Sequence, residues 1–130
     1  MIILDTHIWI WGVHGDSRLP PEYVRCIQTH EETGLGISAI SCWEVAKLVE
    51  LCRLELPISI NDWFEQAFSI SCMALLDLST GICIESTHLP GIFHRDPADQ
   101  LIVATARVHN CPLVTMDKNI LAYPHVMTLP

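Results

Sequence analysis

Two aspartates follow short apolar runs that are typical of buried strands. Asp5 ends the run Met1–Leu4, and Asp117 comes soon after the run Leu113–Thr115. In open α/β sheets, ligands bind beyond the carboxyl ends of the strands, where the connections diverge to opposite faces. If these two strands are neighbours, both carboxylates lie in that crevice. Mg²⁺ prefers such oxygen ligands and typically meets phosphate at its remaining positions, so the two residues indicate a cation site suited to phosphate chemistry.

Two further acids stand in the first turns of predicted helices and complete the candidate set. Glu44 belongs to a helix predicted over Ile40–Cys52, and Asp99 to one predicted over Pro97–His109. Carboxylates that converge on one cleft repel one another, which raises their pKa values and costs stability, and a divalent cation removes that cost. Such a cation also activates water and offsets charge on the phosphate. The four acids therefore predict phosphodiester hydrolysis without a side-chain nucleophile.

Each of these acids also fits a purely structural role at the start of a helix. Ser41–Glu44 is a capping-box sequence, in which the glutamate satisfies a backbone N–H. Asp96–Asp99 provides an N-cap, a proline at the first helical position and an acid in the first turn. Asp5 and Asp117 can cap the turns that follow them. The cation site is favoured because no serine-nucleophile elbow, P-loop or dinucleotide-binding glycine pattern competes with it.

Several polar neighbours are candidates for auxiliary roles. Thr6 and Thr115 adjoin two of the predicted ligands and can orient a carboxylate or hold water, the alternative being hydroxyls that satisfy the local backbone. Arg95 is the candidate for a phosphate contact, with a solvated loop charge as the alternative. The seven histidines are expected to be packed or exposed, as lone histidines usually are, and histidine ligands would favour Zn²⁺ or Mn²⁺ over Mg²⁺.

Charge and size limit the class of protein. The 130 residues are enough for one domain with a real core, and we predict a single domain over residues 1–130. The net charge of −8 disfavours a broad electrostatic grip on nucleic acid, which relies on Lys and Arg to displace counterions. A nuclease must therefore use its acids for another purpose, and binding cations is the simplest one.

Half of the residues are hydrophobic, yet no membrane segment is expected. The longest uncharged stretches, Thr33–Trp43 and Gln66–Leu76, fall short of the ~20 apolar residues that a spanning helix needs. No signal peptide is visible, so we expect a cytoplasmic protein with reduced cysteines in its core. The excess hydrophobicity predicts a partner surface such as a homodimer interface. Trp9, Trp11 and Trp43 are expected to pack in the core or against a partner, with base stacking as the alternative.

Strands alternate with helices along the chain, which implies a parallel sheet covered on both faces. The strands are predicted over Met1–Leu4, Leu35–Ser38, Met73–Leu76, Leu113–Thr115 and Val126–Thr128. The helices are predicted over Ile8–Val13, Glu22–Thr29, Ile40–Cys52, Ile60–Ser69, Ser79–Ser86 and Pro97–His109. An irregular loop, His88–Asp96, leads into the last of these helices.

Four segments together resemble the PIN-domain ribonucleases, and within them the VapC-type toxins of bacterial toxin–antitoxin pairs. The segments are Leu4–His7 with Trp9 and Trp11, Ser38–Glu44, His94–Ile102 and Val114–Asp117. Each motif alone is weak, but the four occur in order and at the family's spacing. The resemblance covers essentially the whole chain.

The resemblance implies a three-layer α/β/α fold around a mostly parallel sheet of about five strands. It implies an acidic pocket made by Asp5, Glu44, Asp99 and Asp117 that uses Mg²⁺ or Mn²⁺ to cut RNA, and a cognate antitoxin as the partner. Asp99 is preferred to Asp96 as the third acid, because it leads directly into the apolar helix. Asp96 is left as a cap or an assisting residue.

The sequence departs from the family pattern at one place. Family members usually carry an aromatic residue a few positions after the fourth acid, where this chain has Ile120 and Leu121, with Tyr123 beyond. This departure concerns the local packing and not the acidic pocket.

Three other classes of protein remain as alternatives. The first is a PIN-fold module that binds a protein or RNA without cutting it, against which the intact acid set argues. The second is a phospho-receiver domain that uses Asp77 and Lys118, but Asp5 lacks the acidic neighbour that this class needs. The third is a DNA-directed nuclease of the flap-endonuclease type, for whose helical arch the chain is too short.

Overall fold

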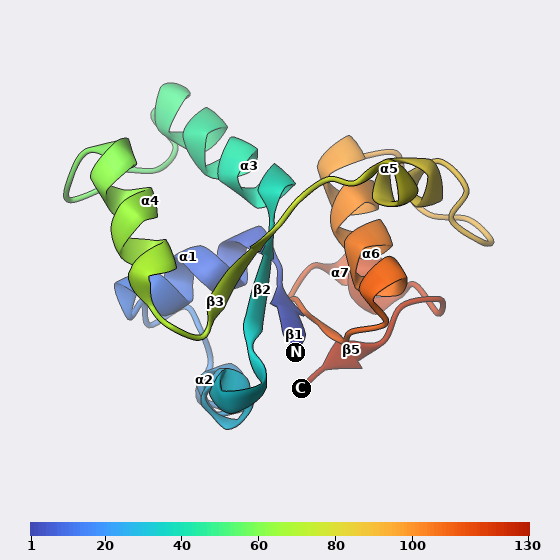
Figure 1. Cartoon of the computed structure of the whole chain (residues 1–130), viewed down its shortest axis with the longest axis horizontal. Helices are drawn as coiled ribbons and strands as arrows, with labels where there is room; N and C mark the ends of the chain where they lie inside the picture. The colour runs from blue at the N-terminus through green and yellow to red at the C-terminus, as the bar shows by residue number, and fades with distance from the viewer.

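The centre of the fold is a five-stranded sheet in the order β3-β2-β1-β4-β5, with β1 in the middle (Figure 1). The computed structural model describes residues 1–130. The strands are β1 (Ile2–Leu4), β2 (Leu35–Ser38), β3 (Met73–Leu76), β4 (Leu113–Val114) and β5 (Thr128–Leu129). All four pairings are parallel, which confirms the predicted parallel sheet and the pairing of the first strand with the fourth.

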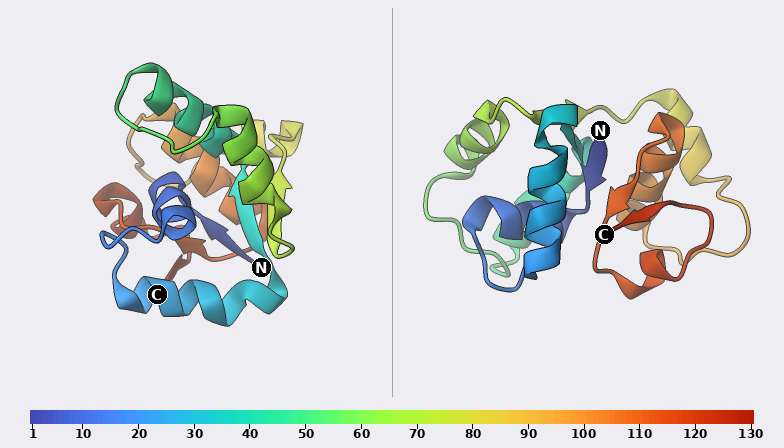
Figure 2. Two further views of the ribbon diagram at one scale, coloured as in Figure 1. Left: turned by 90° about the vertical axis from the view of Figure 1, so that its left-hand side faces the viewer. Right: turned by 90° about the horizontal axis from the view of Figure 1, so that it is seen from below.

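Helices cover both faces of the sheet and complete the three predicted layers. They are α1 (Thr6–His14), α2 (Pro21–His30), α3 (Ala39–Glu50), α4 (Ile60–Ser69), α5 (Thr80–Ser86), α6 (Pro97–His109) and α7 (Lys118–Leu121). The view from below shows α1, α2 and α4 on one side of β1, with α5, α6 and α7 on the other (Figure 2). None of the helices is both long and apolar enough to cross a membrane.

The alternation of side chains along β1 divides the core in two. Ile2 and Leu4 belong to a cluster that includes Trp9 of α1 and Trp63 of α4. Ile3 points to the opposite face and packs in a second cluster with residues of α6 and α7. Because β1 is buried on both faces, an apolar run of three residues suffices to place the carboxylate that follows it.

Most predicted elements are present, with shifts at their ends that have local causes. The first helix begins at Thr6 and not at Ile8, because the side chain of Asp5 accepts a hydrogen bond from the backbone N–H of Thr6. The last strand is Thr128–Leu129 and not Val126–Thr128, because Leu113 and Val114 of β4 pair with these two residues.

The predicted helix over Ile40–Cys52 starts and ends earlier. It begins at Ala39, with Ser38 as its N-cap, and its end is followed by Cys52 at a left-handed φ of 57°. All six cysteines are free, as predicted, but only four of them pack against the core clusters as expected, namely Cys26, Cys42, Cys72 and Cys111. Cys52 and Cys83 are exposed, and the other four are half-buried.

Candidate metal centre

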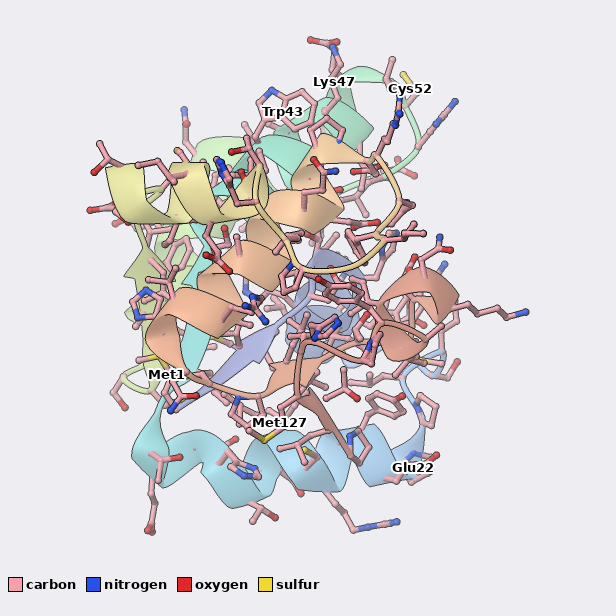
Figure 3. The ribbon with its side chains drawn as sticks, turned by 90° about the vertical axis from the view of Figure 1, so that its right-hand side faces the viewer. Met1, Glu22, Trp43, Lys47, Cys52 and Met127 are labelled. Carbon is pink, nitrogen blue, oxygen red and sulfur yellow. The ribbon has the colours of Figure 1, made fainter.

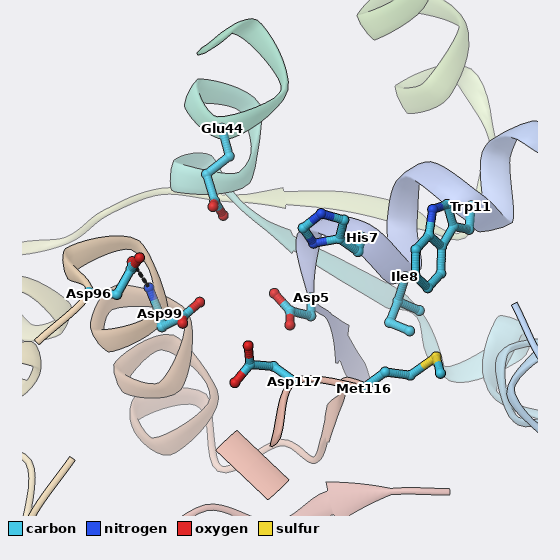
Figure 4. Close-up of a pocket in the computed structure, with 9 residues that line it drawn as sticks. All are labelled: Asp5, His7, Ile8, Trp11, Glu44, Asp96, Asp99, Met116 and Asp117. Carbon is cyan, nitrogen blue, oxygen red and sulfur yellow. Dashed lines mark hydrogen bonds between the residues drawn. The ribbon is translucent and has the colours of Figure 1, made fainter. Parts of the chain in front are cut away.

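A pocket of about 440 Å³ lies beyond the carboxyl ends of β1 and β4 (Figure 4). It is lined by Asp5, His7, Ile8, Trp11, Glu44, Asp96, Asp99, Met116 and Asp117. The structure therefore brings the four predicted acids together, although they are spread over most of the sequence. Asp96, predicted as a cap or assisting residue, lines the same pocket.

Asp5 is held by contacts on both of its carboxylate oxygens. Its Oδ1 accepts from the backbone N–H of Thr6 at 2.8 Å, and its Oδ2 accepts from the Thr115 hydroxyl at 2.6 Å. Burial raises the pKa of Asp5 above its ordinary value, while the two hydrogen bonds oppose that rise. The side chain both caps α1 and faces the pocket, so the capping role and the pocket role coexist.

Glu44 is oriented by Thr6 and not by a capping box. Its Oε1 accepts from the Thr6 hydroxyl at 2.6 Å, and the same hydroxyl lies 2.8 Å from that of Ser41. The capping-box interpretation is wrong, because Ser38 caps α3 and Glu44 stands in the second helical turn. Burial raises the pKa of Glu44, and the charges of Asp5 and Asp96 raise it further.

The pKa of Asp99 is raised by burial and by every other acid of the pocket. It stands in the first turn of α6, where its backbone N–H donates to the Oδ1 of Asp96 at 3.1 Å. Burial, followed by the charges of Asp5, Asp96, Asp117 and Glu44, raises the pKa of Asp99 to about 7. Asp96 is thus the helix cap, and the like charges oppose the ionisation of Asp99 as the sequence led us to expect.

Asp117 combines a cap with a place in the pocket. Its Oδ1 accepts from the backbone N–H groups of Asn119 at 2.9 Å and Ile120 at 3.1 Å, which starts α7. Its own N–H donates to the Thr115 hydroxyl at 3.0 Å, and this hydroxyl donates in turn to Asp5. Thr115 therefore links the strand-end acid of β1 to the one after β4.

His94 belongs to the centre but was not identified from the sequence. Its Nε2 lies 2.9 Å from the Oδ2 of Asp99, without the alignment of a hydrogen bond to any group. One ligand atom from each of His94, Asp99 and Asp117 lies within 4.8 Å of the others. The loop before α6 folds back onto the first turn of this helix, where Gln100 Nε2 donates to the His94 carbonyl at 3.1 Å.

Arg95 and three tryptophans that the sequence singled out lie in different parts of the structure. Arg95 is exposed and does not line the pocket, so its phosphate contact stays a prediction. Trp9 is fully buried in the core, as expected, whereas Trp11 lines the pocket. Trp43 lies on the outer surface of α3 near Lys47 (Figure 3), and its side chain is 56% exposed.

The donor set fits a hard divalent cation. Five carboxylate groups line the pocket, and oxygen is the donor that Mg²⁺ prefers. The raised pKa values of Asp5, Glu44 and Asp99 show that ionisation of this cluster is unfavourable without a counter-charge. The imidazole of His94 at the edge of the cluster is compatible with Mn²⁺ as well.

The fold and the acidic pocket agree with a known family. A family model described as "PIN domain" matches residues 2–126, and the chain belongs to the PIN domain family. Its sequence is 32% identical over 124 residues to Ribonuclease VapC22 of Mycobacterium tuberculosis, an alignment that covers 95% of this chain and 92% of that protein.

Solved structures share the fold over nearly all of the chain. VapBC2 from Rickettsia felis, bound to a DNA fragment from its promoter, aligns with a TM-score of 0.71 at 19% identity, covering 99% of this chain and 98% of that one. FitAcB from Neisseria gonorrhoeae aligns with a TM-score of 0.67 at 21% identity, covering 100% and 97%. At these identities, the likeness shows the common fold.

Proposed function

We propose that this protein is a Mg²⁺- or Mn²⁺-dependent ribonuclease that acts as the toxin of a toxin–antitoxin pair. The observation that carries the proposal is the convergence of Asp5, Glu44, Asp99 and Asp117 on one pocket at the carboxyl ends of β1 and β4. RNA as the substrate is supported by the related Ribonuclease VapC22.

The acids would hold the cation, and their neighbours would fix their orientation. When bound, the cation supplies an activated water and offsets charge on the phosphate. Thr6 fixes the carboxylate of Glu44, and Thr115 fixes that of Asp5. His94 contacts the Oδ2 of Asp99 and acts as a positioning residue for this acid. Such supporting contacts tune both the geometry and the affinity of a metal centre.

The lining of the pocket favours water as the attacking group. No serine, threonine, cysteine or lysine is among the nine lining residues. Carboxylate and imidazole groups can also act as nucleophiles, but in this proposal the carboxylates of the pocket are the ligands of the cation. The acids therefore act by binding and orientation, and the attacking oxygen comes from solvent.

The partners are proposed on separate grounds. Structures with the same fold include toxin–antitoxin complexes, such as one from Klebsiella pneumoniae that aligns with a TM-score of 0.67 at 20% identity and covers 100% of this chain and 97% of that one. This supports a cognate antitoxin. Exposed apolar side chains such as Ile84 and Leu75, 62% and 50% exposed, support a protein interface, and we propose a homodimer.

The direct test is a cleavage assay with labelled single- and double-stranded RNA and DNA oligonucleotides. We expect single-stranded RNA to be cut with Mg²⁺ or Mn²⁺ and not with EDTA. Asp5→Asn should abolish cleavage, while Asp77→Asn should retain it, because Asp77 is exposed and does not line the pocket.

Each contrary result points to a different conclusion. Cleavage that persists in EDTA or in Asp5→Asn would refute the metal-dependent mechanism. Cutting of DNA but not RNA would retain the site and overturn the proposed substrate. Tight RNA binding without cleavage under any metal condition would favour a PIN-fold binding module.

A further inference from the structure

The pocket has a second wall that carries no carboxylate. Asp96 and Asp99 stand on one side, Asp5 and Asp117 in the middle, and Ile8, Trp11 and Met116 on the other side (Figure 4). An indole, an alkyl group and a thioether do not coordinate a cation that prefers oxygen ligands. The acidic centre therefore explains only part of the pocket.

The size of the pocket leads to the same conclusion. A cation with six waters would need roughly 60 to 90 Å³ of cavity volume, since each water needs about 10–15 Å³ in this measure. The pocket measures about 440 Å³, which falls within the usual range of small-molecule sites. Room remains beside the carboxylates for a group larger than a phosphate.

Trp11 is held in place before any ligand arrives. It stands one helical turn after His7 on α1, with the two ring centroids 5.7 Å apart, and it packs against the core. The guanidinium carbon of Arg18 lies 5.2 Å from the centroid of the indole ring, and Arg18 is itself paired with Asp16 at 2.7 Å. Little side-chain entropy remains to be lost when a ligand packs against this ring.

Because the protein is acidic, contacts with the bases must supply more of its affinity for RNA. Only seven residues are Lys or Arg, and three of them, Arg18, Lys47 and Arg107, already pair with acids. Affinity for a nucleic acid therefore depends less on phosphate contacts than it does in basic proteins. Stacking on aromatic side chains is the other main source of affinity for single strands, and it accepts any base.

We propose that Trp11 and Met116 form a base-binding wall for a nucleotide that adjoins the phosphate held at the carboxylates, while Ile8, which is 1% exposed, contributes little contact surface. The inference rests on the proposed ribonuclease function and deepens it. The base packs against the indole and the thioether while its phosphate faces Asp5, Asp99 and Asp117. The wall fixes where the strand lies relative to the acids, and it favours unpaired RNA, because a paired base is not free to enter the pocket.

The test compares Trp11→Leu, Trp11→Phe and wild type on single-stranded RNA hexamers that carry one abasic nucleotide at each position in turn. In wild type, the abasic site should lower kcat/KM at one position beside the cleaved bond by about 5- to 150-fold, the range that loss of one stacked base gives. Trp11→Leu should lower kcat/KM on the intact hexamer by a similar factor and be insensitive to the abasic site. Trp11→Phe should retain most of both effects.

Two further variants separate the wall from a general loss of structure. Met116→Ala removes an exposed part of the wall without touching the core, and it should lower kcat/KM several-fold with an unchanged Tm. Trp43→Leu is the matched control, since Trp43 is exposed and does not line the pocket, and it should behave as wild type. A loss of activity in Trp11→Leu that follows a lower Tm, with Met116→Ala fully active, would overturn the inference.

Fluorescence anisotropy measures binding of the same hexamers with Ca²⁺ in place of Mg²⁺. Together with the cleavage assay, it tells whether a negative result refutes the base-binding wall or the proposed ribonuclease function. If wild type cleaves RNA but the abasic penalty is the same in Trp11→Leu, the wall is refuted and the function stands. If no metal supports cleavage while binding still depends on both the base and Trp11, the function is refuted and the wall stands. Binding and cleavage that are both indifferent to the base refute the wall in either case.

Discussion

Replacing Asp99 by Asn should stabilise the metal-free protein at neutral and alkaline pH. The pKa of Asp99 rises from 3.8 to about 7 in the folded chain, which corresponds to roughly 4 kcal/mol once the group is ionised. The side chain is 18% exposed, so solvent screens little of this cost. Loss of the contact with His94 and relaxation of the neighbours offset part of it. We expect a net gain of about 2 kcal/mol, or roughly 8 °C in Tm.

The pH dependence follows from the direction of the change. Because the folded-state pKa lies above the unfolded one, the folded protein binds more protons between these two values. Its stability therefore falls as the pH rises from about 4 to about 7 and levels off above. Burial and neighbouring charges act in the same direction on Glu44. The difference between Asp99→Asn and wild type should thus vanish near pH 4 and reach its full size near pH 8.

The assay is thermal unfolding in EDTA at pH 4, 6, 7 and 8. Asp77→Asn is the control, since it removes one negative charge from an exposed position away from the pocket, and it should change Tm little at any pH. A lower Tm for Asp99→Asn at every pH, or an offset that does not vary with pH, would refute the account of a strained acidic cluster and favour a structural role for this acid.

Three further outcomes are expected. Mg²⁺ at 100 times its dissociation constant should stabilise wild type by about 2.7 kcal/mol and should stabilise Asp99→Asn much less, as thermal melts will show. His94→Asn should weaken Mn²⁺ binding about 10- to 100-fold in calorimetric titrations, with little change in Tm. His109→Asn is the control, because His109 is exposed, and it should bind Mn²⁺ as wild type does. If His94→Asn and wild type bind Mn²⁺ with equal affinity, His94 plays no part in the metal centre. Thr115→Val should lower stability by about 2 kcal/mol, because it leaves a buried oxygen of Asp5 without its donor, and chemical denaturation measures this loss.

The parts of the fold that could be predicted are those that local chemistry determines. The helix over Pro97–His109 has the predicted bounds, because Asp96 caps it, a proline opens it and Asn110 ends it at a left-handed φ of 51°. The short last strand was misplaced because its position depends on the register with β4. Met127, inside the predicted strand, is 59% exposed, so hydrophobicity alone pointed to the wrong residues.

In the pocket, too, the sequence predicts some contacts and not those that depend on tertiary structure. The meeting of Asp5 and Asp117 followed from strand topology, which a sequence pattern can indicate. The partner of Glu44 is Thr6, 38 positions earlier, and no local pattern distinguishes this contact from a capping box. His94 was missed because its contact with Asp99 depends on the path of an irregular loop.

The link from Thr115 to Asp5 spans 110 positions of the chain, and this has a consequence for synthesis. β1 leaves the ribosome more than a hundred residues before β4 and Asp117. A nascent or prematurely terminated chain therefore carries Asp5 and Glu44 without the acids that complete the centre. If the protein is the toxin that we propose, its activity can begin only after Asp117 has been translated, and products that end before this residue lack one acid of the centre.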